Sequence, residues 1–113
     1  MNVSFQQLQD YLFRLYGGRA NEQGLFMKLV EEIGEVAEVL NMRSGRKAED
    51  TDNLQTHLAN ELVDVIHYTV AIAAINGINL NDAIMEKDRV ASVKYHHEIN
   101  LETYVHESNK DNA

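Results

Sequence analysis

Two pairs of acidic residues, each pair spaced three apart, are the part of this sequence best suited to chemistry. Glu32 and Glu35 lie in the stretch LVEEIGEVAEVL at residues 29–40. Glu61 and Asp64 repeat the spacing in a much more apolar segment. Residues three apart lie on the same side of an α-helix, so each pair can direct two carboxylates to one place. Buried carboxylates need a cationic partner, and the chain has only 10 Lys and Arg against 18 Asp and Glu.

We therefore expect these four carboxylates to hold a metal ion. If the two helices that carry them pack antiparallel, the pairs face each other across the interior. Oxygen ligands alone, in a chain without cysteine, favour Mg²⁺ over zinc, with Mn²⁺ as a possible substitute. The predicted metal ligands are Glu32, Glu35, Glu61 and Asp64. The alternative is two solvated acidic clusters on unrelated faces.

Three charged residues near the first pair are candidates for supporting roles. Glu31 and Glu38 share the acidic side of the same helix and could act as the catalytic group that orients and deprotonates water, or hold a second ion. Lys28 lies one turn before Glu31 and Glu32 and could balance their charge and contact substrate. The alternative for Lys28 is a surface ion pair of little energetic value.

The elements that must position these groups are all expected to be helices, because proline is absent and glycine is rare. A capping box of Ser4 and Gln7 starts a helix at residues 5–16. Further helices are expected at about residues 25–42, 54–76 and 80–95, the third capped by Asp52 or Asn53. Gly77 should end the third helix in a left-handed conformation. The polar residues 43–53 are expected to form a loop, either a lid over the acids or a plain connector.

The third helix is apolar on nearly every side, so it needs cover on every side. Four short helices from one chain can hardly provide that cover. We therefore predict an all-α fold, a four-helix-bundle-type domain at residues 1–95 that assembles as a homodimer or a homotetramer. The polar tail, residues 96–113, either adds a short helix or is disordered.

Composition excludes several classes of protein. A length of 113 residues indicates a single domain, and a net charge of −8 argues against binding of a nucleic-acid polymer. The first twenty residues lack a signal-like apolar block, and the longest apolar run is too short to span a membrane. We therefore expect a cytoplasmic protein without a membrane partner.

The acidic motifs carry a resemblance to a known family. EEIGE at residues 31–35, followed by ELVD at 61–64, resembles the EExxE and ExxD signature of MazG-like all-alpha nucleoside triphosphate pyrophosphohydrolases. The segments GIN at 77–79 and AIMEK at 83–87 also fit that pattern, and the resemblance covers roughly residues 25–95.

The resemblance implies a Mg²⁺-dependent enzyme that cleaves a nucleoside triphosphate between its α- and β-phosphates, in house-cleaning or in control of dNTP pools. It implies that the two acidic pairs hold the metal and that Lys87 reaches the phosphates. Lys94 and Tyr95 fit the family's substrate-binding pattern, whereas Ala91 stands where asparagine is usual. That departure affects the base and sugar contacts more than the chemistry.

Two other functions remain open on the sequence. One is an enzyme related to phosphoribosyl-ATP pyrophosphohydrolases, and the other is a non-catalytic helical interaction protein. Asp64 and His67 are spaced like the Glu-x-x-His units of di-iron bundles, but such bundles need that unit on two helices. His67 is therefore expected in the core or at an interface. The aromatic residues Phe13, Tyr16 and Tyr68 are candidates for base contacts or for core packing.

Overall fold

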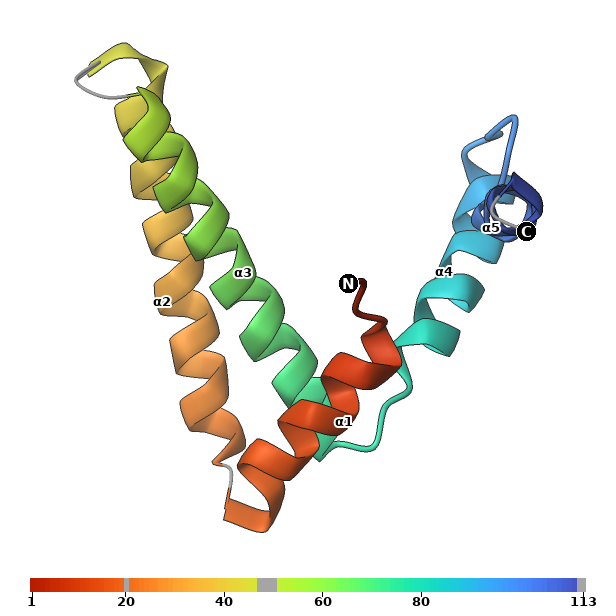
Figure 1. Cartoon of the computed structure of the whole chain (residues 1–113), viewed down its shortest axis with the longest axis horizontal. Coiled ribbons are helices and arrows are strands. Elements are labelled where there is room, and N and C mark those ends of the chain that lie inside the picture. Colours follow the sequence, from red (N-terminus) through yellow and green to blue (C-terminus); the bar gives the residue numbers. More distant parts are fainter. Residues whose placement is uncertain (20, 47–50, 112–113) are drawn as a thin grey trace. The chain divides into compact units, whose positions relative to one another are not determined.

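The computed structural model describes residues 1–19, 21–46 and 51–111, and their regular secondary structure is entirely helical (Figure 1). The α-helices are α1 (Phe5–Tyr16), α2 (Glu22–Asn41), α3 (Thr51–Ile75), α4 (Leu80–Lys94) and α5 (Leu101–Asp111). A short 3₁₀ turn, Gly17–Arg19, follows α1, and a π-helical turn, Met42–Arg46, follows α2. The predicted all-α class is confirmed. The chain divides into two compact units, Met1–Gly77 and Ile78–Ala113.

The first helix has the bounds that its capping box predicted. The Ser4 hydroxyl accepts a hydrogen bond from the Gln7 backbone N–H at 3.0 Å, and the Gln7 side chain accepts one from the Ser4 N–H at 2.9 Å. These bonds satisfy N–H groups that have no partner within the helix. At the other end Gly17 adopts a φ of +45°, which a residue with a side chain rarely adopts.

The second and third helices both start earlier than predicted. Asn21 caps α2, accepting a hydrogen bond from the Gly24 N–H at 3.2 Å, so residues 22–24 are helical rather than part of a turn. Asp52 and Asn53 lie within α3, which begins at Thr51. The predicted loop at 43–53 is therefore shorter, and its first part continues from α2 as the π-helical turn, where Gly45 has a φ of +112°. The lid and connector alternatives fall largely on residues 47–50, which lie outside the described residues.

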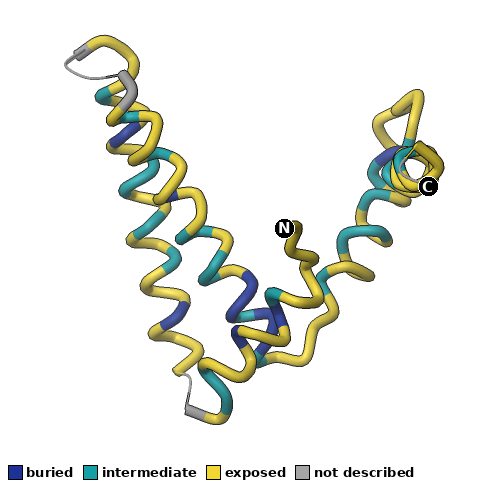
Figure 2. The backbone as a smooth tube through the Cα atoms, in the orientation of Figure 1, coloured by how far each residue is buried: buried dark blue, intermediate teal, exposed yellow. Residues whose placement is uncertain are grey.

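In the first unit, α2 and α3 run antiparallel side by side, and α1 packs against the C-terminal part of α3 (Figure 1). Buried residues concentrate where α1 meets α3 (Figure 2). Leu12 of α1 is fully buried there, and α3 contributes mostly small buried residues. The buried hydrophobic residues are Leu12, Leu25, Val39, Val70, Ala71, Ala73 and Ala74. Small side chains on α3 allow the neighbouring helices to approach closely.

The middle of α3 remains partly uncovered in the first unit. Leu62, Val63 and Ile66 are 45%, 61% and 48% exposed, as expected if α1 and α2 cannot cover an apolar helix on all sides. The segment Asn53–Ile75 is long enough, and its mean hydropathy high enough, to cross a membrane. The longest uninterrupted apolar run in the sequence is by itself too short for this. The packing of α3 against α1 and α2, together with the acidic Glu61 and Asp64, favours a helix of a protein core. The oligomeric state stays a prediction.

The second unit contains the helices α4 and α5, and side-chain oxygens accept hydrogen bonds from backbone N–H groups at the start of each helix. Asn79 caps α4 by accepting a hydrogen bond from the Asp82 N–H at 3.0 Å, which confirms the predicted start. Asp88 of α4 accepts a bond from the Leu101 N–H at 2.7 Å, at the start of α5. Asn100 adds a cap at the Thr103 N–H. The tail at 96–113 thus contains a helix, the first of its two predicted alternatives.

Candidate metal centre

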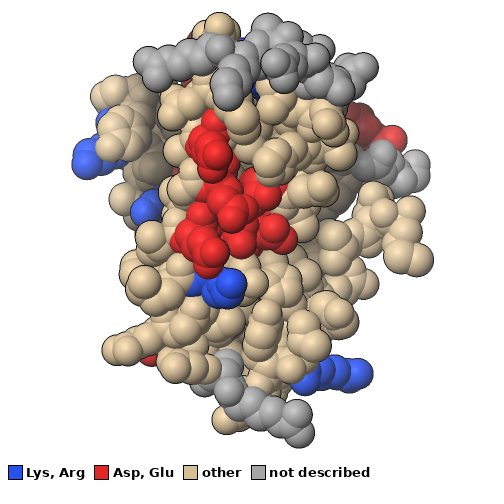
Figure 3. Space-filling model, turned by 90° about the vertical axis from the view of Figure 1, so that its left-hand side faces the viewer, with Lys and Arg blue, Asp and Glu red and all other residues tan. Residues whose placement is uncertain are grey.

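Acidic side chains gather on one face of the α2–α3 hairpin (Figure 3). Glu32 of α2 and Glu61 and Asp64 of α3 each offer one carboxylate oxygen, and these oxygens all lie within 4.8 Å of one another. Oxygens that share one ion at about 2.0 to 2.6 Å lie at most about 4 to 5 Å apart. The antiparallel packing of α2 and α3 therefore brings both acidic motifs to one place, at a separation that suits a divalent cation.

Two oxygens in this cluster lack a hydrogen-bond partner. Glu32 Oε2 and Glu61 Oε2 are buried and accept no hydrogen bond from any described residue. Glu61 is the most buried charged residue described, with a side chain only 10% exposed. A buried acceptor without a donor destabilises the fold, and more so when it is charged. A bound cation would satisfy both oxygens, so the donor set and its burial fit a metal ion.

The fourth predicted ligand, Glu35, also lies beside Glu61. The neighbouring carboxyl group of Glu35 is the main cause that raises the pKa of Glu61 from its ordinary 4.5 to about 8, followed by the carboxyl group of Glu32 and by burial. Neighbouring carboxylates and burial both disfavour the charged form, so Glu61 keeps its proton to a higher pH when no cation is bound. Glu32, Glu61 and Asp64 thus come together, and Glu35 is close enough to Glu61 to raise its pKa. That these four residues hold a metal ion stays a prediction.

One contact in the cluster was missed by sequence reasoning. His57 lies one turn before Glu61 on α3, and its Nε2 atom is 3.3 Å from Glu61 Oε1. The sequence contained a signal for it, since residues four apart are neighbours on a helix surface. His67 was the histidine considered beside the acidic residues, and His57 was not paired with Glu61.

The candidates for supporting roles on α2 lie at the surface. Lys28 forms an ion pair with Glu31 at 3.4 Å between exposed side chains, and this contact raises the pKa of Lys28. The structure therefore contains the surface ion pair that was the alternative for Lys28. Glu38 is exposed as well. Their roles in water activation and substrate contact stay predictions.

His67 belongs to an aromatic contact between helices. Its Nε2 atom shares a 2.7 Å hydrogen bond with the hydroxyl of Tyr16, at the end of α1. The Tyr68 ring packs edge-on against the imidazole, with centroids 4.9 Å apart. His67 therefore has the expected packing role, and its proximity to Asp64 in sequence does not make it part of the acidic cluster.

The remaining predicted substrate-binding residues belong to the second unit. Lys87 and Lys94 lie on α4, and the Lys94 ammonium is 5.4 Å from the ring centroid of Tyr95, which follows the helix. The acidic cluster belongs to the first unit. Contact of Lys87, Lys94 and Tyr95 with a substrate therefore stays a prediction.

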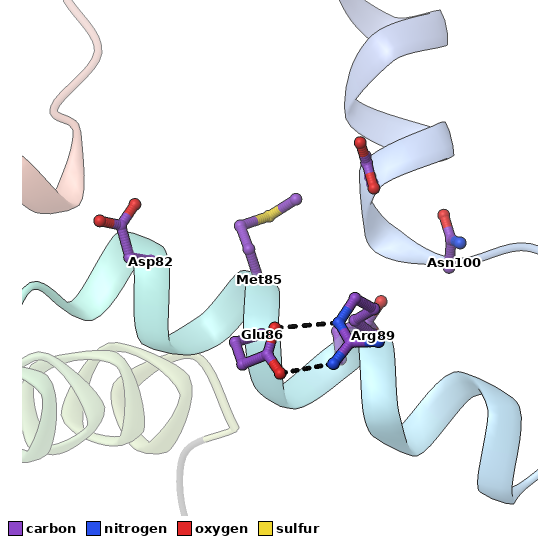
Figure 4. A pocket seen from close by; sticks show the side chains of 7 residues that line it. Asp82, Met85, Glu86, Arg89 and Asn100 are labelled. Atoms are coloured by element: carbon purple, nitrogen blue, oxygen red, sulfur yellow. Dashed lines mark hydrogen bonds and ion pairs between the residues drawn. The ribbon is translucent and has the colours of Figure 1, made fainter.

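The second unit also contains a pocket of about 290 Å³ between α4 and α5 (Figure 4). Its lining does not include Lys87, Lys94 or Tyr95. The lining residues are Asp82, Met85, Glu86, Asp88, Arg89, Asn100 and Glu102. Arg89 makes two hydrogen bonds to the Glu86 carboxylate, at 2.9 and 2.7 Å, so its charge is already neutralised. We assign no role in the reaction to this pocket.

Comparison with known proteins agrees with the geometry. Residues 20–90, which include all four acidic residues of the cluster, match the model of the MazG nucleotide pyrophosphohydrolase domain. The crystal structure of iMazG from Vibrio DAT 722 matches with a TM-score of 0.63 and 31% identity, over 82% of this chain and 98% of that chain. No curated protein matches the sequence. The predicted family and enzyme class are therefore confirmed, and the chain belongs to the MazG nucleotide pyrophosphohydrolase family.

Proposed function

We propose that this protein hydrolyses nucleoside triphosphates between the α- and β-phosphates, with Mg²⁺ held by Glu32, Glu35, Glu61 and Asp64. The observation that carries the proposal is the carboxylate cluster around the buried Glu61, in which two oxygens have no partner among the described residues. A donor set of carboxylates alone favours Mg²⁺, and Mn²⁺ is the expected substitute. The products are a nucleoside monophosphate and pyrophosphate.

The carboxylate cluster and the proposed triphosphate substrate are both negatively charged. A triphosphate carries about four negative charges, so the carboxylates alone would repel it. When bound, the divalent ion neutralises both the carboxylates and the phosphate oxygens and polarises the phosphorus atom. The task of the four acidic residues is to fix the position of that charge between α2 and α3.

The remaining steps need a base and cationic contacts. Glu31 and Glu38 are exposed on the helix that carries Glu32 and Glu35, where either could orient and deprotonate the attacking water. Lys28 and Lys87 supply positive charge for the phosphates in this proposal. Lys94 and Tyr95 are assigned to the base and sugar.

The biological purpose that we propose is removal of unwanted nucleotides or control of dNTP pools. Both purposes require the same reaction and differ only in the preferred base. A panel of canonical and damaged NTPs and dNTPs distinguishes them by relative kcat/KM. Phosphoribosyl-ATP belongs in the same panel, since hydrolysis of that compound alone would contradict the proposed substrate class.

The decisive test is pyrophosphate release from that panel, with Mg²⁺ or with a chelator, by the full chain and by Glu35→Gln. We expect activity with Mg²⁺, loss of activity with chelator, and a large loss in the variant, which keeps the shape of the side chain but lacks its charge. Glu107→Gln, on the exposed surface of α5, is the matched control and should remain active. Full activity of Glu35→Gln, or no pyrophosphate from any nucleotide, would show that the proposal is wrong.

A further inference from the structure

His57 contacts only one of the two oxygens of Glu61. Its Nε2 atom lies 3.3 Å from Glu61 Oε1, while Glu61 Oε2 is buried and has no hydrogen-bond partner in the described part of the chain. The two oxygens of this carboxylate therefore have different surroundings. One oxygen lies beside an imidazole on its own helix, and the other is buried without a partner among the described residues. Glu32 and Asp64 each offer an oxygen within 4.8 Å of a Glu61 oxygen.

We propose that His57 is a positioning residue that holds Glu61 Oε1 and thereby turns Oε2 toward the metal ion. The proposal rests on the metal site described under the proposed function. His57 is not one of the three residues, Glu32, Glu61 and Asp64, whose possible ligand atoms lie within 4.8 Å of one another. Its side chain is 51% exposed, whereas that of Glu61 is 10% exposed, so His57 approaches the buried carboxylate from the solvent side.

A glutamate ligand benefits from such a contact because its side chain has several rotatable bonds. Without support, Glu61 would have to lose that freedom when the ion binds. A neighbour that fixes the carboxylate beforehand raises metal affinity, and loss of such a neighbour typically weakens binding by about 10- to 100-fold. His57 is well placed for this task because both residues lie on the same rigid helix, four positions apart.

The chemistry of imidazole also suits the position. A lysine or arginine would place a permanent positive charge beside the ligand and compete with the cation. An imidazole can present an N–H to Oε1 in its neutral form, so it orients the carboxylate without a fixed charge. This argues for orientation of Glu61, and not charge neutralisation, as the purpose of the contact.

The test measures Mn²⁺ binding to the full chain, without nucleotide, at one pH, by electron paramagnetic resonance of the unbound ion. His57→Leu removes the donor, and we expect it to raise the Kd for Mn²⁺ by about 10-fold. His57→Gln keeps an N–H donor at similar reach and should bind Mn²⁺ nearly as well as the natural chain. His106→Leu removes an exposed histidine from α5 and should leave the Kd unchanged. Thermal unfolding without metal should be similar for all four proteins, since exposed side chains are replaced.

Three results would overturn the positioning role. The first is a normal Kd for Mn²⁺ in His57→Leu together with loss of Mn²⁺ binding in Glu61→Gln. That result would support the metal site but show that His57 does not contribute to it. The second is an equal loss of binding and of metal-free stability in His57→Leu and His57→Gln, which indicates a structural role. The third is a directly coordinated nitrogen in the spin-echo spectrum of bound Mn²⁺, lost in His57→Leu, which would make His57 a ligand. Normal binding in Glu61→Gln would instead contradict the proposed metal site itself.

Discussion

Glu61 is the residue on which the acidic cluster depends. It is buried, it contacts His57, and its neighbours Glu35 and Glu32 raise its pKa to about 8. A carboxyl group with that pKa is protonated over much of the neutral range when no cation is present. The proton and the metal ion therefore compete for the same oxygens.

This competition predicts how stability depends on pH. The folded state keeps the Glu61 proton at pH values where the unfolded chain, with a pKa of 4.5, has already lost it. Proton binding therefore favours folding, and the contribution of Glu61 to the free energy of unfolding decreases as the pH rises from about 4.5 through about 8. We expect the Tm of the metal-free protein to fall over that range and Mg²⁺ to raise the Tm more at about pH 8 than at about pH 5.5.

Thermal unfolding at both pH values, with Mg²⁺ or with a chelator, measures this effect. Glu61→Gln cannot titrate, so its metal-free Tm should depend less on pH than that of the natural chain. An equally steep dependence in the variant would assign the effect to other groups. A larger Mg²⁺ stabilisation at the lower pH would contradict the predicted competition.

At the residue scale, the sequence predicted most of the acidic cluster. The spacing of Glu32, Glu35, Glu61 and Asp64 is a local property, and antiparallel packing of the two helices was enough to bring the pairs together. His57 was missed, although its spacing of four from Glu61 makes the two residues neighbours on a helix. The His57 side chain is exposed, whereas that of Glu61 is buried. This difference arises from helix packing, which cannot be read from the spacing of residues along the chain.

At the scale of elements, helix ends were predicted where a reciprocal cap exists. Ser4 and Gln7 satisfy each other's backbone, so the bounds of α1 were correct. The start of α3 was wrong because Asp52 and Asn53 have side chains that favour caps, yet the helix continues through them from Thr51. Local preference is weak, and packing of neighbouring helices can override it.

The attachment of α1 to α3 depends on a contact that sequence could not reveal, since Tyr16 and His67 are 51 residues apart. Burial raises the pKa of Tyr16, so its hydroxyl keeps its proton and can share the bond with His67. Tyr16→Phe removes only that hydroxyl and leaves the His67 nitrogen without its partner. We expect a loss of about 1 kcal/mol in the free energy of unfolding, measured by urea denaturation.

Tyr104→Phe is the matched control for this prediction, because Tyr104 is exposed on α5. Its free energy of unfolding should change little. If Tyr16→Phe is as stable as the natural chain, the bond between α1 and α3 contributes no net stability. Equal losses in the two variants would indicate a general effect of removing a phenolic hydroxyl.

At the scale of the whole molecule, exposed apolar side chains indicate that the first unit is not complete by itself. Leu62, Val63 and Ile66 of α3 are about half exposed, and α2 exposes Phe26 and Met27 as well. Aromatic residues and methionine are enriched in protein interfaces, and monomers rarely expose large apolar patches. The apolar pattern of the sequence led to the same expectation, because a helix that is apolar on every side needs more cover than one chain supplies.

We therefore expect a homodimer or a homotetramer, with a mass in solution of two or four times 12.9 kDa. Light scattering during size-exclusion chromatography measures this mass. Ile66→Glu places a charge on the exposed side of α3 and should shift the protein toward smaller species, because an unpaired charge in an interface is strongly unfavourable. Val3→Glu adds the same charge at an exposed position before α1 and should leave the mass unchanged. A monomeric natural chain, or an unchanged mass in Ile66→Glu, would mean that α3 does not form the interface and that its apolar side faces solvent.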